Sequence, residues 1–478
     1  MMTAISETYV YMDELQDQRF TEVRDLVRHA LIFLMVSIIF YLPIASIPLP
    51  IFKFYSSQRL LFLIMSYALI YNVAMQGKHR LKVERMWFLI FLAGFFISFF
   101  IGVYMHGYDF ITKNAGGLRP DRTFTGMMLY FVFIVTFRGH RNLERLYWAL
   151  AIVGFAVILS VRLKLTSGVS GYIMDASYEH DTYVAKEYIS KGLYYIRETF
   201  LTLDTNNYGG IVATILLIGV YQLSLNTLGR KQKLFLIALI FISTWSLIAT
   251  LSLVSIIKTI ATLCLFYWLK VDKLKPQYLF YLTMGIVVVI VLGSYFPNTF
   301  LGHLLIQRFE KVWINLPTLL TYSHNNYITD NFSSRIVMAI DAITRMHSPL
   351  WGTGGVALKY NVATGNHIDW VNWLYMYGLF TFIPLVCWQG FLLRSLLWIR
   401  KKTKQTGDAY FDQNYQLKII IAIVILIGTW IEMLNSPLFL VFWAWISIVS
   451  AASAQFHYDY NKYLKEHRIK NMTTEQAE

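Results

Sequence analysis

Apolar segments of about 20 residues alternate with polar connections along nearly the whole chain, and a helix needs about that length to cross a bilayer. The pattern predicts an all-α polytopic membrane protein with about twelve transmembrane helices. We expect one transmembrane domain over residues 30–455, between tails at 1–29 and 456–478. The twelve predicted spans are 30–48, 57–76, 86–105, 124–138, 146–165, 206–225, 233–249, 250–269, 278–297, 370–395, 417–434 and 437–455.

Composition strengthens this interpretation. Of the 478 residues, 56% are hydrophobic and only 15% are charged, and the mean hydropathy is +0.48. These values are typical of a membrane protein rather than a soluble one. No cleavable signal peptide precedes the first apolar run, so we expect the first span to direct insertion. Cys264 and Cys387 fall in different predicted spans, which argues against a disulfide framework.

The basic residues behind the formal charge of +14 stand mostly in the connections between predicted spans. They are not gathered in one folded domain, as nucleic-acid binding would require. Basic residues fill alternate short connections, and positively charged connections stay in the cytoplasm. The pattern therefore predicts that both tails are cytoplasmic and that two long loops, 166–205 and 298–369, lie outside the membrane. We expect no nucleic-acid partner. The basic connections are 78–85, 138–145, 230–233, 270–275 and 394–418.

The second long loop is expected to be partly helical. Over residues 334–347, apolar side chains recur at helical spacing while Arg335, Asp341 and Arg345 lie off that face, as in an amphipathic helix at a membrane surface. The following segment SPLWGTGG, residues 348–355, ends the helix. Its glycines fit either a plain tight turn or a phosphate cradle.

Two candidate catalytic residues, His367 and Asp369, stand where the second long loop returns to the membrane. Histidine ionises closest to neutral pH, so His367 is a natural general base for a substrate at the outer leaflet. Each residue also has a structural interpretation, because His suits an interface and Asp favours helix starts. Both interpretations stay open.

Four arginines of the two long loops are candidates for binding a lipid-linked diphosphate, since guanidinium groups bind phosphate oxygens bidentately. Lipid headgroups or nearby carboxylates could equally engage each of them. Lys258 is a fifth candidate because a charge near the middle of an apolar run is costly, although it could also snorkel to the surface. Such cations can stabilise a diphosphate leaving group, so we expect neither metal nor cofactor. The four arginines are Arg197, Arg308, Arg335 and Arg345.

Four segments, taken in order, resemble the O-antigen ligase and O-antigen polymerase superfamily of bacterial envelope glycosyltransferases. DTNNYGG at 204–210 resembles the element that opens a central span, and TLSLVSIIK at 250–258 resembles the T-x-S-R-G-like element. The third, residues 333–355, resembles the Arg–helix–P-L-x-G-x-G run. The fourth, HIDWVNWLYMYGLFTF at 367–382, resembles the H-N-x-x-L stretch.

The chain departs from this superfamily at two points. Leu253 stands where the second element usually has Arg, and the sequence leaves open whether Lys258 replaces it. Ile368 and Asp369 replace the residues that usually follow the matching His367, which makes Asp369 a helper or an alternative base. Arg335 and His367 are the positions that match best.

The resemblance implies a GT-C-like, metal-independent, inverting glycosyltransferase of the bacterial inner membrane, with its active site facing the periplasm. Its donor would be an oligosaccharide on undecaprenyl pyrophosphate, and a chain-length regulator would be a further partner. A polymerase would pass the growing glycan to a lipid-linked repeat unit, whereas a ligase would pass it to lipid A-core. Tyr377 before Gly378 is more typical of polymerases. A flippase of lipid-linked oligosaccharide and an assembly scaffold remain alternatives.

Overall fold

A computed structural model describes the helical bundle and part of the second long loop. The described residues are helical or lie in turns, and no strand occurs among them. This part of the chain is consistent with an all-α membrane protein. The described residues are 29, 32–33, 35–40, 83–107, 126–127, 129–130, 140–163, 165, 205–250, 252–271, 340, 343–344, 346–354, 369–433 and 439–475.

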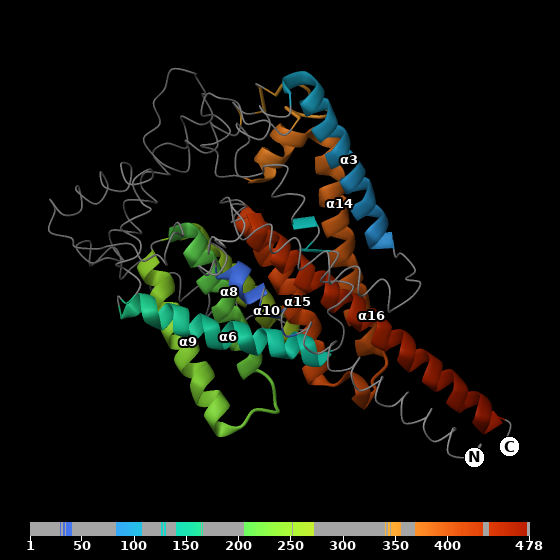
Figure 1. Cartoon of the computed structure of the whole chain (residues 1–478). Coiled ribbons are helices and arrows are strands. Elements are labelled where there is room, and N and C mark those ends of the chain that lie inside the picture. The colour runs from blue at the N-terminus through green and yellow to red at the C-terminus, as the bar shows by residue number, and fades with distance from the viewer. Residues whose placement is uncertain are drawn as a thin grey trace, which may run out of the picture.

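Eight long helices form the described bundle (Figure 1). α15 lies at its centre, in contact with α8, α10, α14 and α16. α3 packs along α14, while α6 crosses α8 and α9. The helices are α3 (Val83–His106), α6 (His140–Arg162), α8 (Thr205–Leu223), α9 (Arg230–Thr250), α10 (Leu253–Val271), α14 (Asp369–Gln405), α15 (Gln413–Glu432) and α16 (Phe439–Glu475), with a short 3-10 helix η3 at Ala409–Phe411.

Six of these helices, within the described residues, are long and apolar enough to cross a membrane: α3, α6, α9, α10, α14 and α15. The apolar part of α8 is shorter, at Asn207–Leu223. The predicted tight connection between the seventh and eighth spans is confirmed, because α9 ends at Thr250 and α10 begins at Leu253. The predicted spans 57–76 and 278–297 lie outside the described residues, so the expected twelve stays a prediction.

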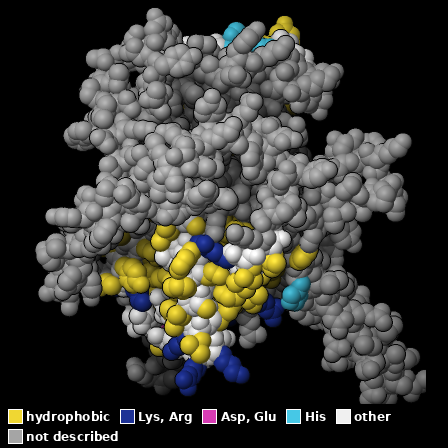
Figure 2. All heavy atoms as spheres, turned by 90° about the vertical axis from the view of Figure 1, so that its left-hand side faces the viewer, with side chains coloured by type: hydrophobic (Ala, Val, Ile, Leu, Met, Phe, Trp, Pro, Cys, Tyr) yellow, Lys and Arg dark blue, Asp and Glu magenta, His cyan; other side chains and the backbone are white. Residues whose placement is uncertain are grey.

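The basic ends of the helices meet on one side of the bundle. At this end the Nζ atom of Lys418 on α15 pairs with Glu144 on α6. The turn between α8 and α9 reaches the start of α15, where the backbone N–H of Asn226 donates to Oδ1 of Asn414 at 3.2 Å. Figure 2 shows several Lys and Arg side chains at the lower end of a broad hydrophobic surface. Basic residues therefore gather at these helix ends, although Arg162 at the end of α6 lies over the ring of Trp245, far along α9 from its basic start.

The helix α14 is broken at Gly378, where φ is 68° and ψ is −174°. Its short arm, residues 369–377, meets its long arm, residues 379–405, at a sharp bend (Figure 1). The rings of Trp370 and Phe382 lie 6.1 Å apart, whereas 12 residues of straight helix would separate them by about 18 Å. The predicted span over 370–395 lies within Trp370–Gln405, which is long and apolar enough to cross a membrane, but the helix is interrupted at Gly378.

The break in α14 removes hydrogen bonds within the helix, and the turn 348–354 replaces them with bonds of its own backbone. The N–H of Thr353 donates to the carbonyl of Tyr375 at 3.0 Å, and the N–H of Leu379 donates to the carbonyl of Pro349 at 2.9 Å. Phe380 donates to Leu350 in the same way. Unpaired backbone groups are costly in a membrane, so this pairing stabilises the break. In the described residues the glycine segment thus acts as a tight turn against α14.

Close glycine contacts hold this turn between α3 and α14. A Cβ atom on Gly378 would lie 2.5 Å from the backbone N of Gly352, and one on Gly102 would lie 2.0 Å from the carbonyl oxygen of Gly354. Gly352 and Gly354 also have positive φ values, 66° and 70°. Only residues without a Cβ atom fit this approach and this backbone conformation. We call these four residues the glycine interlock.

Candidate functional site

A buried ion pair joins three helices. Nζ of Lys258 on α10 donates to Oε2 of Glu432 on α15 at 2.7 Å. The same Nζ donates to the carbonyl of Gly210 at 3.0 Å and to Oγ1 of Thr214 at 2.9 Å, both on α8. An ammonium group has three donors, and these three protein acceptors use all of them. Lys258 and Glu432 are only 4% and 6% exposed.

The ion pair lies close to the helix ends opposite the basic ends. Lys258 stands five residues after the start of α10, which is about 7.5 Å along the helix. Glu432 is the last residue of α15, and Gly210 lies near the start of α8. α10 begins at Leu253, three residues later than the predicted span, so Lys258 lies nearer to the start of its helix than the sequence pattern indicates. Its expected position near the middle of the membrane stays a prediction.

Hydroxyl groups extend this polar region between α8, α9 and α10. The hydroxyls of Tyr208 and Ser246 lie 3.0 Å apart, and those of Ser252 and Ser255 lie 2.8 Å apart. A Cβ atom on Gly209 would lie 2.6 Å from Oγ of Ser255, so glycine allows α8 to approach α10 closely. The structure thereby brings together segments 204–210 and 250–258, the first two elements of the family resemblance. Nothing in the sequence alone placed them in contact.

The short arm of α14 begins beside the end of α15. Nε1 of Trp370 donates to the carbonyl of Trp430 at 3.3 Å. Trp430 stands two residues before Glu432, and Trp370 directly follows Asp369. The described start of α14 therefore lies near the helix end that carries the ion pair.

Most of the predicted site residues lie outside the part of the chain that the structure describes. The structure gives Asp369 as the first residue of α14, but its side chain is also outside the description. Lys258 is the one predicted site residue with described side-chain contacts. The predicted roles of the others stay predictions. The residues outside the description are Arg197, Arg308, Arg335, Arg345 and His367.

Sequence reasoning missed Glu432 and Thr214. Glu432 is an acidic residue inside the predicted apolar span 417–434, so the rule that singled out Lys258 applies to it equally. Opposite charges in two separate spans are a signal for a buried pair. Thr214 gave no such signal, because a threonine inside an apolar span commonly bonds to its own helix, as Thr214 does to Gly210 at 3.0 Å.

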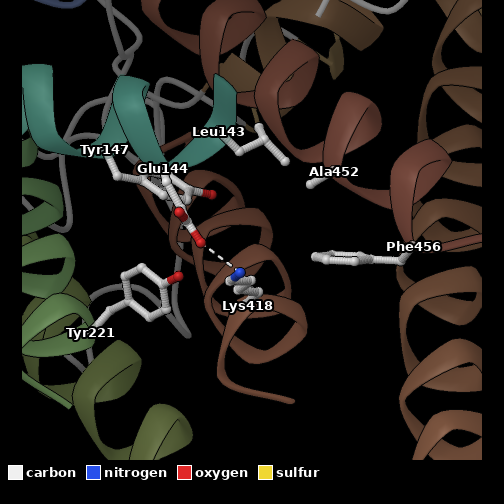
Figure 3. A pocket seen from close by; sticks show the side chains of 7 residues that line it. All are labelled: Leu143, Glu144, Tyr147, Tyr221, Lys418, Ala452 and Phe456. Atoms are coloured by element: carbon white, nitrogen blue, oxygen red, sulfur yellow. Dashed lines mark ion pairs between the residues drawn. The ribbon is translucent and has the colours of Figure 1, made fainter. Parts of the chain in front are cut away.

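A second polar cluster lines a small cavity at the basic end of the bundle (Figure 3). There Lys418 pairs with Glu144, and the hydroxyl of Tyr221 points toward them. Tyr221 is 1% exposed, and its hydroxyl has no hydrogen-bond partner among the described residues. The ring of Tyr147 meets that of Tyr221 edge-on at 5.6 Å. This cluster lies at the end opposite the Lys258–Glu432 pair.

Among the described residues, no group of three or more His, Cys, Asp or Glu side chains is placed to hold a metal ion. The site described above therefore consists of an ion pair, hydroxyl groups and the start of a re-entrant helix. Comparison of the chain with protein-family models and with curated protein sequences finds no match. The family resemblance rests on the four sequence elements alone.

Proposed function

We propose that this protein is a glycosyltransferase of the bacterial inner membrane that polymerises oligosaccharide repeat units linked to undecaprenyl pyrophosphate, on the periplasmic side. The observation that carries the proposal is the hydrogen bond of Trp370 to Trp430. It holds the start of α14 next to the end of α15, and in the sequence Asp369 and His367 stand one and three residues before Trp370. A substrate held at these helix ends would meet the residues that the sequence assigns to catalysis.

In the proposed reaction, His367 accepts the proton of the acceptor hydroxyl while that oxygen attacks the anomeric carbon of the donor. The bond between this carbon and the diphosphate oxygen breaks, and the electron pair leaves with the lipid diphosphate. Attack opposite the leaving group inverts the anomeric centre. Asp369 orients His367 or replaces it as the base.

Arginine side chains neutralise the departing diphosphate in this scheme. Arg335 is the main candidate, and it acts together with Arg308, Arg345 or Arg197. Lys258 would need to release a partner before it could bind phosphate, because Gly210, Thr214 and Glu432 take all its donors. This favours the arginines as the diphosphate ligands.

A carrier of lipid-linked oligosaccharide is the second candidate, and the broken helix α14 is the observation that favours it. Transporters build binding sites from discontinuous helices near the middle of the membrane. However, the described ion pair lies at helix ends, which fits a site at one membrane face better than a path through the middle. The ligase alternative uses the same donor and differs only in its acceptor.

Glycan profiles of cells that carry His367→Ala would test the proposal, once expression and membrane insertion are confirmed. Lipopolysaccharide and lipid-linked pools are compared. We expect single repeat units on lipid A-core and loss of longer chains. Polymer held on the lipid carrier would indicate a ligase, and repeat units trapped on the cytoplasmic side would indicate a carrier. An unchanged profile would exclude His367 from the reaction.

A further inference from the structure

We infer that Glu432, acting through Lys258, is a positioning residue for the transferase site and that Lys258 is not a diphosphate ligand. This inference rests on the proposed function. It concerns how the two charged side chains hold α8 and α10, which carry the first two sequence elements, against the end of α15.

The contacts of Lys258 are those of a structural crosslink. One ammonium group joins α10 to the carbonyl and hydroxyl of α8 and to the carboxylate of α15, at 3.0, 2.9 and 2.7 Å. With three donors and three acceptors, no donor remains for a phosphate oxygen. A direct ligand for diphosphate would have donors that face open space, and Lys258 is almost completely buried.

The backbone of α8 lies very close to the carboxylate of Glu432. A Cβ atom on Gly210 would lie 2.1 Å from Oε1 of Glu432, so α8 approaches this oxygen as closely as glycine permits. Gly428 lies against Lys258 without such crowding, since a Cβ atom there would make an ordinary van der Waals contact with Cε of Lys258 at 3.4 Å. The ion pair therefore fixes the spacing of α8, α10 and α15 at their shared end.

The end of α15 also contacts the short arm of α14, so its position affects the position of that arm. Glu432 is held by Lys258, and two residues earlier the carbonyl of Trp430 accepts the hydrogen bond of Trp370. Asp369 directly precedes Trp370. A shift at the end of α15 would thus move the start of the arm, which begins at Asp369 and which the predicted base His367 precedes by two residues in the sequence. Small displacements of catalytic groups have large effects on rate.

The test is a double-mutant cycle with Lys258→Met, Glu432→Gln and both changes together, each reconstituted in liposomes. Apparent melting temperature and the kcat and KM for a synthetic polyprenyl-diphosphate repeat unit are measured. Each single variant should melt well below the wild type, because it leaves one charge buried without its partner. The neutral double variant should melt above both. Its kcat should fall about 10- to 100-fold with KM nearly unchanged.

Other outcomes overturn the inference. A large rise in KM in the double variant would make Lys258 a direct ligand of the diphosphate. Full activity would reduce the pair to a purely structural role, and a double variant that melts no higher than the single variants would show that the two side chains do not act together.

The exposed pair Lys462–Glu466, at 3.7 Å, provides the matched control. Lys462→Met with Glu466→Gln should leave melting temperature, kcat and KM as in the wild type, because exposed pairs contribute little to stability. If folded wild-type protein transfers no sugar at all, the proposed function fails. The melting temperatures of the cycle still report whether Lys258 and Glu432 are coupled, so the two failures are distinguishable.

Discussion

Substitution of Gly378 by alanine should destabilise the protein strongly, because two independent costs meet at this residue. Its backbone, with φ 68° and ψ −174°, lies in a region that is essentially restricted to glycine. A Cβ atom would also lie 2.3 Å from the carbonyl oxygen of Leu350 and 2.5 Å from the backbone N of Gly352. Neither contact can be relieved by a side-chain rotation, since both atoms belong to the backbone.

The expected magnitude follows from these two costs. Holding alanine in this conformation costs about 1–3 kcal/mol, and forcing the turn away from α14 costs about 1–3 kcal/mol more. Separation of the turn also weakens backbone hydrogen bonds between 349–353 and 375–380, at about 0.5–1.5 kcal/mol each. We therefore expect Gly378→Ala to lower the free energy of unfolding by about 3 kcal/mol or more.

Gly390→Ala is the matched control on the same helix. A Cβ atom on Gly390 would meet nothing within 4 Å, and the residue lies inside the long arm. Alanine should stabilise a helix interior by about 0.5–1 kcal/mol relative to glycine. The two substitutions are chemically identical, but their surroundings differ. Their effects on the free energy of unfolding should therefore have opposite signs.

Thermal unfolding in detergent can be followed with a thiol-reactive dye, because Cys264 and Cys387 are free and only partly exposed in the folded protein. Gly378→Ala should expose these thiols at a much lower temperature than Gly390→Ala. Equal melting of the two variants would refute the role of the glycine interlock in holding the turn 348–354 against the break in α14.

Two further predictions concern α8. Tyr221→Phe should leave stability unchanged or slightly raised, because the buried hydroxyl of Tyr221 has no partner among the described residues. Tyr208→Phe should lower stability by about 0.5–1.5 kcal/mol, because the hydroxyl of Tyr208 pairs with that of Ser246 at 3.0 Å. Melting curves of the two variants, measured side by side, test this contrast. Gly210→Ala should lower stability by about 1–3 kcal/mol, because its Cβ atom would displace the carboxylate of Glu432. A Gly210→Ala variant that melts with the wild type would show that the carboxylate can move freely.

The helices could be predicted from the sequence because each one forms its backbone hydrogen bonds within itself and needs only an apolar run of sufficient length. The ranges of α9 and α10 follow directly from their apolar runs, with the tight connection between them. The break in α14 could not be predicted in this way. Gly378 stands in an apolar run like many transmembrane glycines, and the break becomes stable only because the distant turn 348–354 pairs with its backbone.

The candidate site was predictable only in part. A charge in an apolar run pointed to Lys258, and the same reasoning applied to Glu432 would have suggested their pairing. The approach of α8 to α10 depends on tertiary packing around Gly209 and Gly210, which one sequence does not reveal. Arg335 and His367 match the family resemblance best, and their roles stay predictions because both lie outside the described residues.

Reconstitution tests the central claim most directly. Purified protein in liposomes would receive a synthetic undecaprenyl-pyrophosphate repeat unit, and the products would be separated by size, with His367→Ala as the inactive control. The account predicts lipid-linked chains of two or more repeat units and released undecaprenyl pyrophosphate from the wild type alone. Chains that form equally with His367→Ala, or no transfer by folded wild-type protein to either a repeat unit or lipid A-core, would contradict it.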